Sequence, residues 1–81
     1  MDGNHAAIVA AARQMGFEVI DLSGVGRGCP DLLLYSHRTR RFTLVEVKTP
    51  SGKVNVLQAD FASRVPVSVV RTVDDLLALR R

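Results

Sequence analysis

Two stretches decide the fold: Pro30-Asp31-Leu32-Leu33-Leu34-Tyr35 and Phe42-Thr43-Leu44-Val45-Glu46-Val47-Lys48. Both are short, rich in Leu and Val, and bounded by turn-type residues, a pattern typical of β-strands. The polar link between them, residues 36–41, is short enough for a hairpin. The sequence therefore predicts two neighbouring strands, the first of which carries a carboxylate near its start.

The second strand carries a carboxylate and an ammonium two residues apart. Because side chains alternate across a strand, Glu46 and Lys48 should share one face, and Val45 and Val47 the other. Asp31 and Glu46 on adjacent strands would suit a hard cation such as Mg²⁺, with the Val47 carbonyl as a candidate third ligand. Lys48 could then hold or deprotonate the attacking water and offset charge on a transferring phosphoryl group.

Each of these residues also has a simpler interpretation. Glu46 and Lys48 could be an exposed ion pair on a sheet, which contributes little to stability. Asp31 could be a turn residue after Pro30. Finding all three in the predicted strand context favours chemistry over three separate structural roles.

Composition predicts one globular domain over residues 1–81, since 47% of the chain is apolar and 23% is charged. A lone cysteine and the lack of a signal-peptide pattern or a membrane-length apolar run favour a cytoplasmic protein with no membrane partner. The net charge is +3, and nine of the eleven basic residues are Arg. This balance fits a nucleic-acid partner, but a solvated basic surface would give the same numbers.

The rest of the chain shows helical and strand patterns in alternation. In order, these predict a helix over 5–15, a strand over 17–22, a glycine-rich loop over 23–29, a helix over 55–64, a strand over 67–71 and a helix over 73–81. The order favours an α/β fold in which helices flank a small mixed sheet. The strand–helix–strand unit over 42–71 should be a parallel crossover.

Local signals place the ends of these helices. Asp2 or Asn4 is expected to cap the first helix, and Gly16 to end it. In the second helix, an apolar stripe recurs at helical spacing, with Gln58 beside it near the buried edge; its members are Val54, Leu57, Phe61 and Val65. Thr72 should cap the last helix, with acids in its first turn and arginines in its last.

The glycine-rich loop has the spacing Gly24-x-Gly26-x-Gly28 and leads into a strand. Phosphate-cradling glycine loops lead into a helix and have other spacings, so the dinucleotide and Walker interpretations are poor. Two interpretations remain open. The loop is either a flexible connection with positive-φ positions, or the mouth of a site from which Arg27 reaches a phosphate.

The segments 28–34 and 44–48 resemble the PD-(D/E)XK nuclease superfamily. The small size, the glycine loop before Pro30-Asp31 and the downstream glutamine resemble its VRR-NUC family of virus-type replication-repair nucleases. The resemblance implies a restriction-endonuclease-like αβββαβ core and a Mg²⁺- or Mn²⁺-dependent endodeoxyribonuclease. Asp31 and Glu46 match the family's metal ligands, Lys48 matches its catalytic lysine, and Gln58 matches the helix glutamine that faces the site.

The resemblance also implies a homodimer acting on branched DNA such as four-way junctions, in the replication, recombination or repair of phage or bacteria. The alternative is an inactive DNA-binding or assembly module on the same fold. One feature departs from the family pattern: the acidic residue usual on the first helix is not evident, and Asp2, Asn4 or His5 stands in its region.

DNA contacts are expected from the two loops that flank the proposed site, through Arg27 and Lys53. The hairpin arginines are either a second contact patch or merely solvated; they are Arg38, Arg40 and Arg41. For a dimer interface, the sequence offers the alanine-rich first helix or a C-terminal leucine segment, and the first helix is slightly favoured. The C-terminal candidates are Leu76, Leu77 and Leu79.

Overall fold

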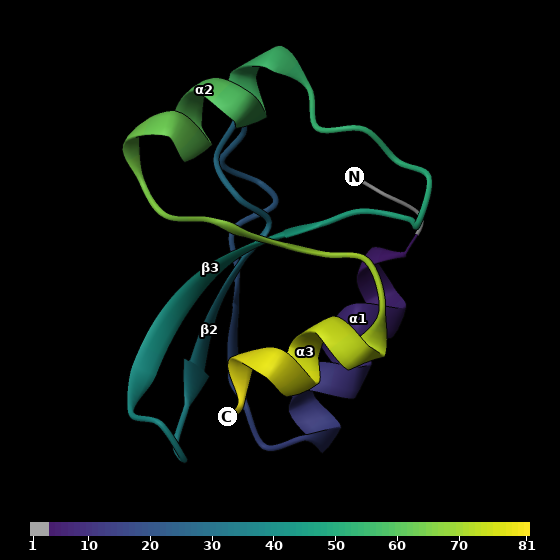
Figure 1. Ribbon diagram of the computed structural model, residues 1–81, viewed down its shortest axis with the longest axis vertical. Coiled ribbons are helices and arrows are strands. Elements are labelled where there is room, and N and C mark those ends of the chain that lie inside the picture. The colour runs from purple at the N-terminus through teal and green to yellow at the C-terminus, as the bar shows by residue number, and fades with distance from the viewer. Residues whose placement is uncertain (1–3) are drawn as a thin grey trace.

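The computed structural model describes residues 4–81 and has an alternating helix and strand order (Figure 1). Its elements are α1 (His5–Gln14), β1 (Glu18–Asp21), β2 (Leu32–Ser36), β3 (Arg41–Val47), α2 (Val56–Arg64), β4 (Ser68–Val70) and α3 (Val73–Leu79). The order is the αβββαβ core with one further helix. The predicted restriction-endonuclease-like α/β fold is therefore confirmed.

The four strands form one mixed sheet in the order β1-β2-β3-β4. β1 pairs with β2 and β2 with β3 in antiparallel fashion, whereas β3 and β4 are parallel and α2 connects them. In the β2–β3 hairpin, Leu32 is opposite Val45 and Ser36 is opposite Arg41. This register places the start of β2 beside the end of β3, at the end of the sheet away from the hairpin turn.

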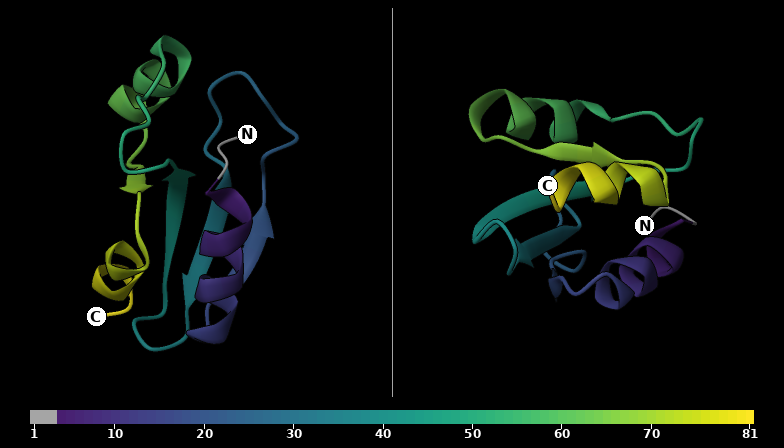
Figure 2. Two further views of the ribbon diagram at one scale, coloured as in Figure 1. Left: turned by 90° about the vertical axis from the view of Figure 1, so that its right-hand side faces the viewer. Right: turned by 60° about the horizontal axis from the view of Figure 1, so that its bottom comes forward.

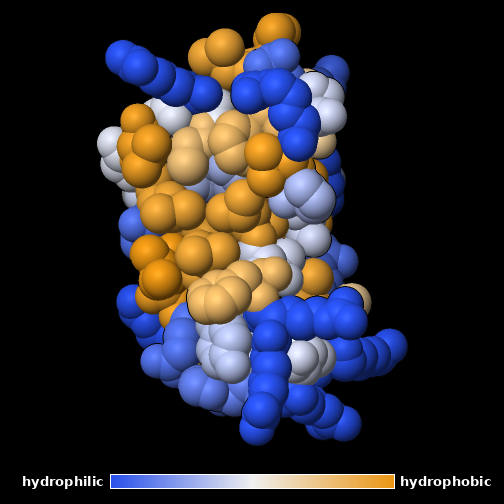
Figure 3. Space-filling model, turned by 90° about the vertical axis from the view of Figure 1, so that its left-hand side faces the viewer, coloured by the Kyte–Doolittle hydropathy of each residue, from blue (hydrophilic) through white to orange (hydrophobic). Residues whose placement is uncertain are grey.

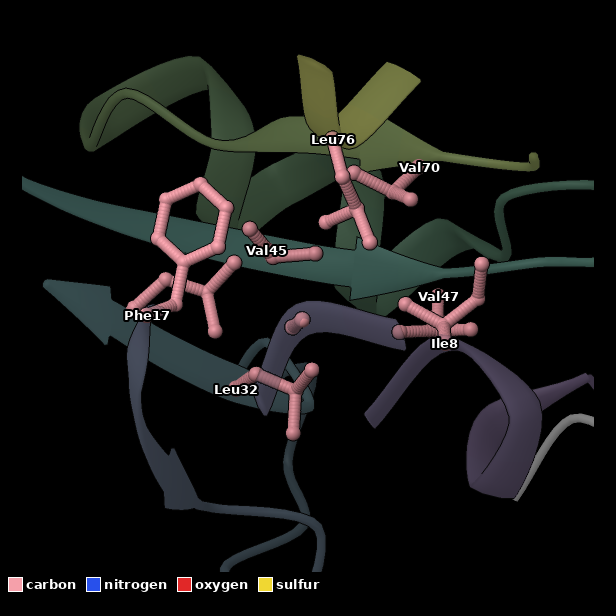
Figure 4. Close-up of a cluster of buried hydrophobic side chains, with 9 residues drawn as sticks. Ile8, Phe17, Leu32, Val45, Val47, Val70 and Leu76 are labelled. Atoms are coloured by element: carbon pink, nitrogen blue, oxygen red, sulfur yellow. The ribbon is translucent and has the colours of Figure 1, made fainter. Parts of the chain in front are cut away.

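Helices lie on both faces of the sheet (Figure 2). α1 and α3 cover one face, and the side chains between them and the sheet form the core (Figure 4). The core members are Ile8, Ala12, Phe17, Leu32, Leu34, Val45, Val47, Val70 and Leu76. α2 lies over the other face, near the end of the sheet where β2 begins (Figure 1). Among the described residues, no helix has the length and apolar character needed to cross a membrane.

The first helix begins at His5 and is followed by Gly16, as the sequence predicts, but the side chain at its N-cap has another role. Gly16 follows the last turn at φ +91°, a left-handed conformation that suits glycine. Asn4 is at the N-cap position, yet its side chain makes no capping bond. Its amide instead donates hydrogen bonds to the carbonyl oxygens of Lys48 (3.1 Å) and Arg71 (2.8 Å). Asn4 therefore ties α1 to the ends of β3 and β4, and the other predicted cap, Asp2, lies outside the described residues.

The apolar stripe predicted for the second helix is only half correct. Phe61 and Val65 are partly buried, but Leu57 is 59% exposed and Val54 is 36% exposed. No residue of α2 is fully buried, because this short helix covers only part of its sheet face. The helix ends at Val65, immediately before Pro66, as predicted.

The last helix is shorter than its sequence pattern. It ends at Leu79, so Arg80 is its C-cap residue and Arg81 lies beyond it. The prediction that these arginines occupy the last turn is therefore wrong. The acids do lie in the first turn, where Asp75 Oδ2 accepts hydrogen bonds from the N–H groups of Arg71 (2.7 Å) and Thr72 (3.0 Å). These bonds lower the pKa of Asp75, the Arg71 bond most strongly.

Candidate active site

Two buried carboxylates meet where β2 begins and β3 ends. Asp31 directly precedes β2, and the hairpin register brings it opposite Glu46. Asp31 is 9% exposed and Glu46 is 3% exposed. Asp31 Oδ2 accepts a hydrogen bond from the Val47 N–H at 2.9 Å, a bond that fixes the carboxylate against β3. Glu46 is therefore not part of an exposed surface pair, and Asp31 is more than a turn residue.

Gln58 joins the second helix to this carboxylate pair. Its Oε1 accepts from the Asn55 N–H at 3.0 Å, and its own N–H donates to Asn55 Oδ1 at 2.9 Å, so the two residues form a capping box. The amide nitrogen then points the other way, and Nε2 donates to Glu46 Oε2 at 3.0 Å. Because a backbone N–H can only donate, the capping bond fixes which end of the amide faces Glu46.

A pocket of about 480 Å³ contains the proposed catalytic residues. It is lined by Ser23, Gly26, Arg27, Gly28, Cys29, Asp31, Glu46, Lys48, Asn55, Leu57 and Gln58. The structure thus brings together all four residues that the family resemblance selected, with Arg27 at the same opening. Lys53 is exposed in the neighbouring loop and does not line the pocket. The hairpin arginines lie at the opposite end of the sheet.

The donor set suits Mg²⁺ or Mn²⁺ held partly by solvent and substrate. Within residues 4–81, no three His, Cys, Asp or Glu side chains cluster as metal ligands, and the pocket offers only the pair Asp31 and Glu46. Mg²⁺ usually binds through one or two carboxylates, several waters and substrate phosphates. In a strand, the C=O of a residue points to the same side as its N–H. The Val47 carbonyl therefore faces the Asp31 side and can serve as a third oxygen ligand.

The first helix brings no acidic side chain to this pocket in the described part of the chain. Asn4 is engaged with backbone carbonyls, and His5 is buried and does not line the pocket. The Nε2 atom of His5 has no hydrogen-bond partner and lies 3.9 Å from Asp21 Oδ1. Asp21 itself accepts from the hydroxyl and the N–H of Ser23, and these bonds lower its pKa. Neither Asn4 nor His5 takes the place of the missing acid in the pocket.

The glycine-rich loop forms one wall of the pocket and packs tightly on α2. Gly26, Arg27 and Gly28 all have positive φ, at +75°, +59° and +80°. A Cβ atom on Gly28 would overlap the backbone carbonyl group of Leu57. Glycine at this position therefore lets the loop approach the first turn of the helix that carries Gln58. The positive-φ positions of the first interpretation are therefore present, and the loop also lines the mouth of the pocket; that Arg27 reaches a phosphate stays a prediction.

Three supporting residues had not been predicted for these roles. Asn55 orients Gln58, and the Asn-x-x-Gln spacing was a readable capping signal. Arg71 Nη1 donates to the carbonyl oxygens of Thr49 (2.9 Å) and Gly52 (2.6 Å) and so shapes the loop that carries Lys53. The contacts of Arg71 and Asn4 join distant parts of the chain, so no local sequence pattern indicates them.

Comparison with known proteins identifies the family of the chain. The family model of the VRR-NUC domain matches residues 3–72, a span that includes the whole pocket. No curated protein and no solved structure is significantly similar to the chain. Because the matched region covers most of the 81 residues, the chain belongs to the VRR-NUC domain family.

Proposed function

We propose that residues 1–81 form one nuclease domain, a Mg²⁺- or Mn²⁺-dependent endodeoxyribonuclease that hydrolyses phosphodiester bonds. Membership of the VRR-NUC family implies a nuclease-type function. The observation that carries the finer proposal is the convergence of Asp31, Glu46, Lys48 and Gln58 on one pocket. Two buried carboxylates beside an ammonium are costly to assemble unless they serve a cation and a phosphate.

Each residue of the proposed site has a role that follows from its chemistry. Asp31, Glu46 and the Val47 carbonyl would hold the divalent cation, which supplies Lewis-acid polarisation of the phosphodiester. Lys48 positions the attacking water and offsets negative charge on the phosphoryl group. Gln58 holds Glu46 in its binding orientation through the bond from Nε2. Arg27 at the pocket mouth and Lys53 in the neighbouring loop contact phosphates beside the scissile bond.

The proposed substrate is branched DNA, such as a four-way junction, in the cytoplasm of a bacterial or phage-infected cell. Cutting a junction symmetrically requires two active sites related by a two-fold axis, which a homodimer supplies. We therefore propose a homodimer as the active form.

The structure offers a surface for that dimer, here called the apolar face. It is the face of the sheet opposite the core, where the register aligns Ile20, Leu33 and Leu44 in one row and places Phe42 beside them. Phe42 is 65% exposed and Ile20 is 50% exposed. A groove of about 750 Å³ runs between this face and α2, and Figure 3 shows an extended hydrophobic surface on this side of the molecule. This surface is a better candidate than the alanine-rich helix, because α1 exposes only small apolar side chains.

One assay tests the proposed activity. The full chain is incubated with linear, nicked and four-way-junction DNA in Mg²⁺, in Mn²⁺ and in EDTA. We expect metal-dependent strand cleavage, lost in Lys48→Ala and retained in Arg64→Ala, whose guanidinium is paired with Asp60 on the exposed side of α2. Binding of DNA without cleavage in either metal would favour the alternative, an inactive DNA-binding or assembly module.

A further inference from the structure

Five arginines gather at the end of the sheet farthest from the pocket. Three come from the β2–β3 turn and the start of β3, and two follow α3; they are Arg38, Arg40, Arg41, Arg80 and Arg81. Arg38 and Arg80 line the same hollow of about 330 Å³, so the hairpin and the C-terminal segment meet there. Figure 1 places both at the lower end of the molecule, where Figure 3 shows long hydrophilic side chains below the hydrophobic surface. We call these five arginines the hairpin-end surface.

The hairpin-end surface carries an excess of positive charge. Among residues 4–81, none of its five arginines forms an ion pair. The carboxylate of Glu18, at the start of β1, is engaged by His37 Nε2 at 3.1 Å. Five like charges at one end of a small domain repel one another, and a polyanion would relieve that repulsion.

The backbone gives a second, independent indication. Arg27 and Arg40 are the only non-glycine residues with positive φ in the described chain, at +59° and +58°. Glycine adopts this left-handed conformation without the steric cost that a Cβ atom brings. Both arginines are in loops, one at the pocket and one at the hairpin turn. An arginine held where glycine would be unstrained points to a role for its side chain.

The length of β3 sets the distance between the pocket and the hairpin-end surface. Arg41 and Lys48 are seven residues apart along an extended strand, which corresponds to about 23 Å at roughly 3.3 Å per residue. On B-DNA, with a rise of about 3.4 Å per base pair, that distance is about 7 base pairs. A short duplex held at the pocket would therefore end before it reached the hairpin-end surface.

We propose that the hairpin-end surface is a second binding site for DNA phosphates, about 7 base pairs from the phosphate in the pocket. The proposal rests on the proposed nuclease function, which places DNA at the pocket. The chemistry recognised is the phosphodiester backbone, which guanidinium groups bind without reading base sequence. Those phosphates belong either to the same duplex or to a second arm of a branched substrate.

The test uses Arg40→Gly, which removes one guanidinium and also relieves the positive-φ strain. Its melting temperature should equal or exceed that of the parent chain, so a loss of DNA binding cannot be attributed to unfolding. Arg38→Ala and Arg80→Ala remove neighbouring charges. Arg64→Ala is the matched control, since it removes the same charge from the exposed side of α2.

Binding is measured by fluorescence anisotropy in EDTA over a range of salt concentrations. Three DNAs are compared: a loop-capped duplex of about 6 base pairs, a linear duplex of about 24 base pairs, and a four-way junction with arms of about 24 base pairs. The loop-capped duplex is shorter than the distance of about 7 base pairs between the pocket and the hairpin-end surface. For Arg40→Gly, the slope of log K against log salt should fall by about 0.9 on long DNA and stay unchanged on the short duplex. Arg64→Ala should leave the slope of log K against log salt unchanged on all three DNAs.

The outcomes distinguish phosphates of the same duplex from those of a second arm. They also distinguish failure of the nuclease proposal from failure of the second phosphate site. A reduced slope on the long linear duplex assigns the phosphates to the same duplex, whereas a reduction confined to the junction assigns them to a second arm. Equal effects on short and long DNA, or no effect on any DNA, would overturn the second site. If the parent chain cleaves DNA in neither Mg²⁺ nor Mn²⁺ but shows the length-dependent effect of Arg40→Gly, the nuclease proposal fails and the second site stands.

Discussion

Gln58 Nε2 donates a hydrogen bond to Glu46 Oε2 across 3.0 Å, while the oxygen of the same amide accepts from the N–H of Asn55. One side chain therefore starts a helix and orients a buried carboxylate. The two roles use different atoms of the amide, so a single substitution can remove one role and keep the other.

Gln58→Glu provides that separation. A glutamate oxygen still accepts from the Asn55 N–H, so α2 should begin normally and the melting temperature should change little. The donor to Glu46 is lost, and a hydrogen bond to a charged group is worth about 1.5–3 kcal/mol. We expect cleavage to slow by about 10- to 100-fold. Gln14→Glu adds the same charge at an exposed position of α1 and should leave the rate unchanged; equal rates for the two variants would contradict the orienting role.

Asp31→Asn tests the metal site. The asparagine oxygen can still accept from the Val47 N–H, so the fold should persist, whereas Asp31→Ala leaves that buried donor unpaired at a cost of about 1–3 kcal/mol. Removing the negative charge should weaken Mg²⁺ binding and abolish cleavage. Titration calorimetry with Mg²⁺ measures the affinity, and Asp60→Asn on the exposed side of α2 is the control. Unchanged affinity in Asp31→Asn would remove this residue from the site.

The three loop glycines form a matched series. A methyl group added at Gly24 or at Gly26 would contact no other atom. Gly26, however, has a φ of +75°, a backbone conformation that side chains disfavour. At Gly28 the methyl group overlaps the Leu57 carbonyl, at φ +80°. Gly24→Ala should therefore be nearly neutral, and Gly26→Ala should destabilise by about 1–2 kcal/mol. Gly28→Ala should be the worst and should also slow cleavage, because it pushes the loop away from α2.

Denaturant unfolding measures the stability of this series, and the cleavage assay supplies the second readout. If Gly28→Ala behaves like Gly26→Ala in both, then packing of the loop on α2 does not hold the pocket together.

Acid should destabilise the domain through Asp75. Hydrogen bonds from the Arg71 and Thr72 N–H groups lower the pKa of this carboxyl in the folded state. The stabilisation is therefore fully present above the unfolded value of about 3.9 and is lost as the pH falls through the lower folded value. The free energy of unfolding should decline below about pH 4, and it should decline less steeply in Asp75→Asn. Asp74→Asn, its exposed neighbour, should retain the full decline.

The sequence predicted the fold class because its signals are local. Alternation around Glu46 placed Val45 and Val47 in the core, and Gly16 and Pro66 ended their helices where expected. It also selected four residues that line the pocket, because the family motif carries them in a fixed order along the chain; they are Asp31, Glu46, Lys48 and Gln58.

What the sequence did not predict depends on contacts between distant residues. Asn4 has the side chain of a capping residue, but it does not accept a hydrogen bond from the start of α1. Its amide instead donates hydrogen bonds to the carbonyl oxygens of Lys48 and Arg71, which are close only in the folded chain. The exposure of Leu57 depends on how little of the sheet α2 covers, which helical periodicity cannot reveal. The close contact of Gly28 with Leu57 joins segments 29 residues apart, and glycine content alone does not indicate it.

The final prediction concerns the dimer. Light scattering should report roughly twice the 8.8 kDa mass of one chain at micromolar concentration, where many specific complexes persist. A stable interface buries about 800 Å² per partner, and Phe42, at 65% exposure, is a large exposed side chain of the apolar face. Phe42→Glu should therefore give a monomer, because it would bury an unpaired charge in the interface.

Two variants localise the interface. Val73→Glu changes an exposed apolar residue of α3, away from the apolar face, and should remain dimeric. Ala10→Glu changes an exposed position of α1 and tests the interface that the sequence favoured. If Ala10→Glu is monomeric and Phe42→Glu is dimeric, the interface lies on the first helix. A parent chain that stays monomeric and still cuts both strands of a junction together would refute both the dimer and the paired-cut mechanism, because one active site would then suffice.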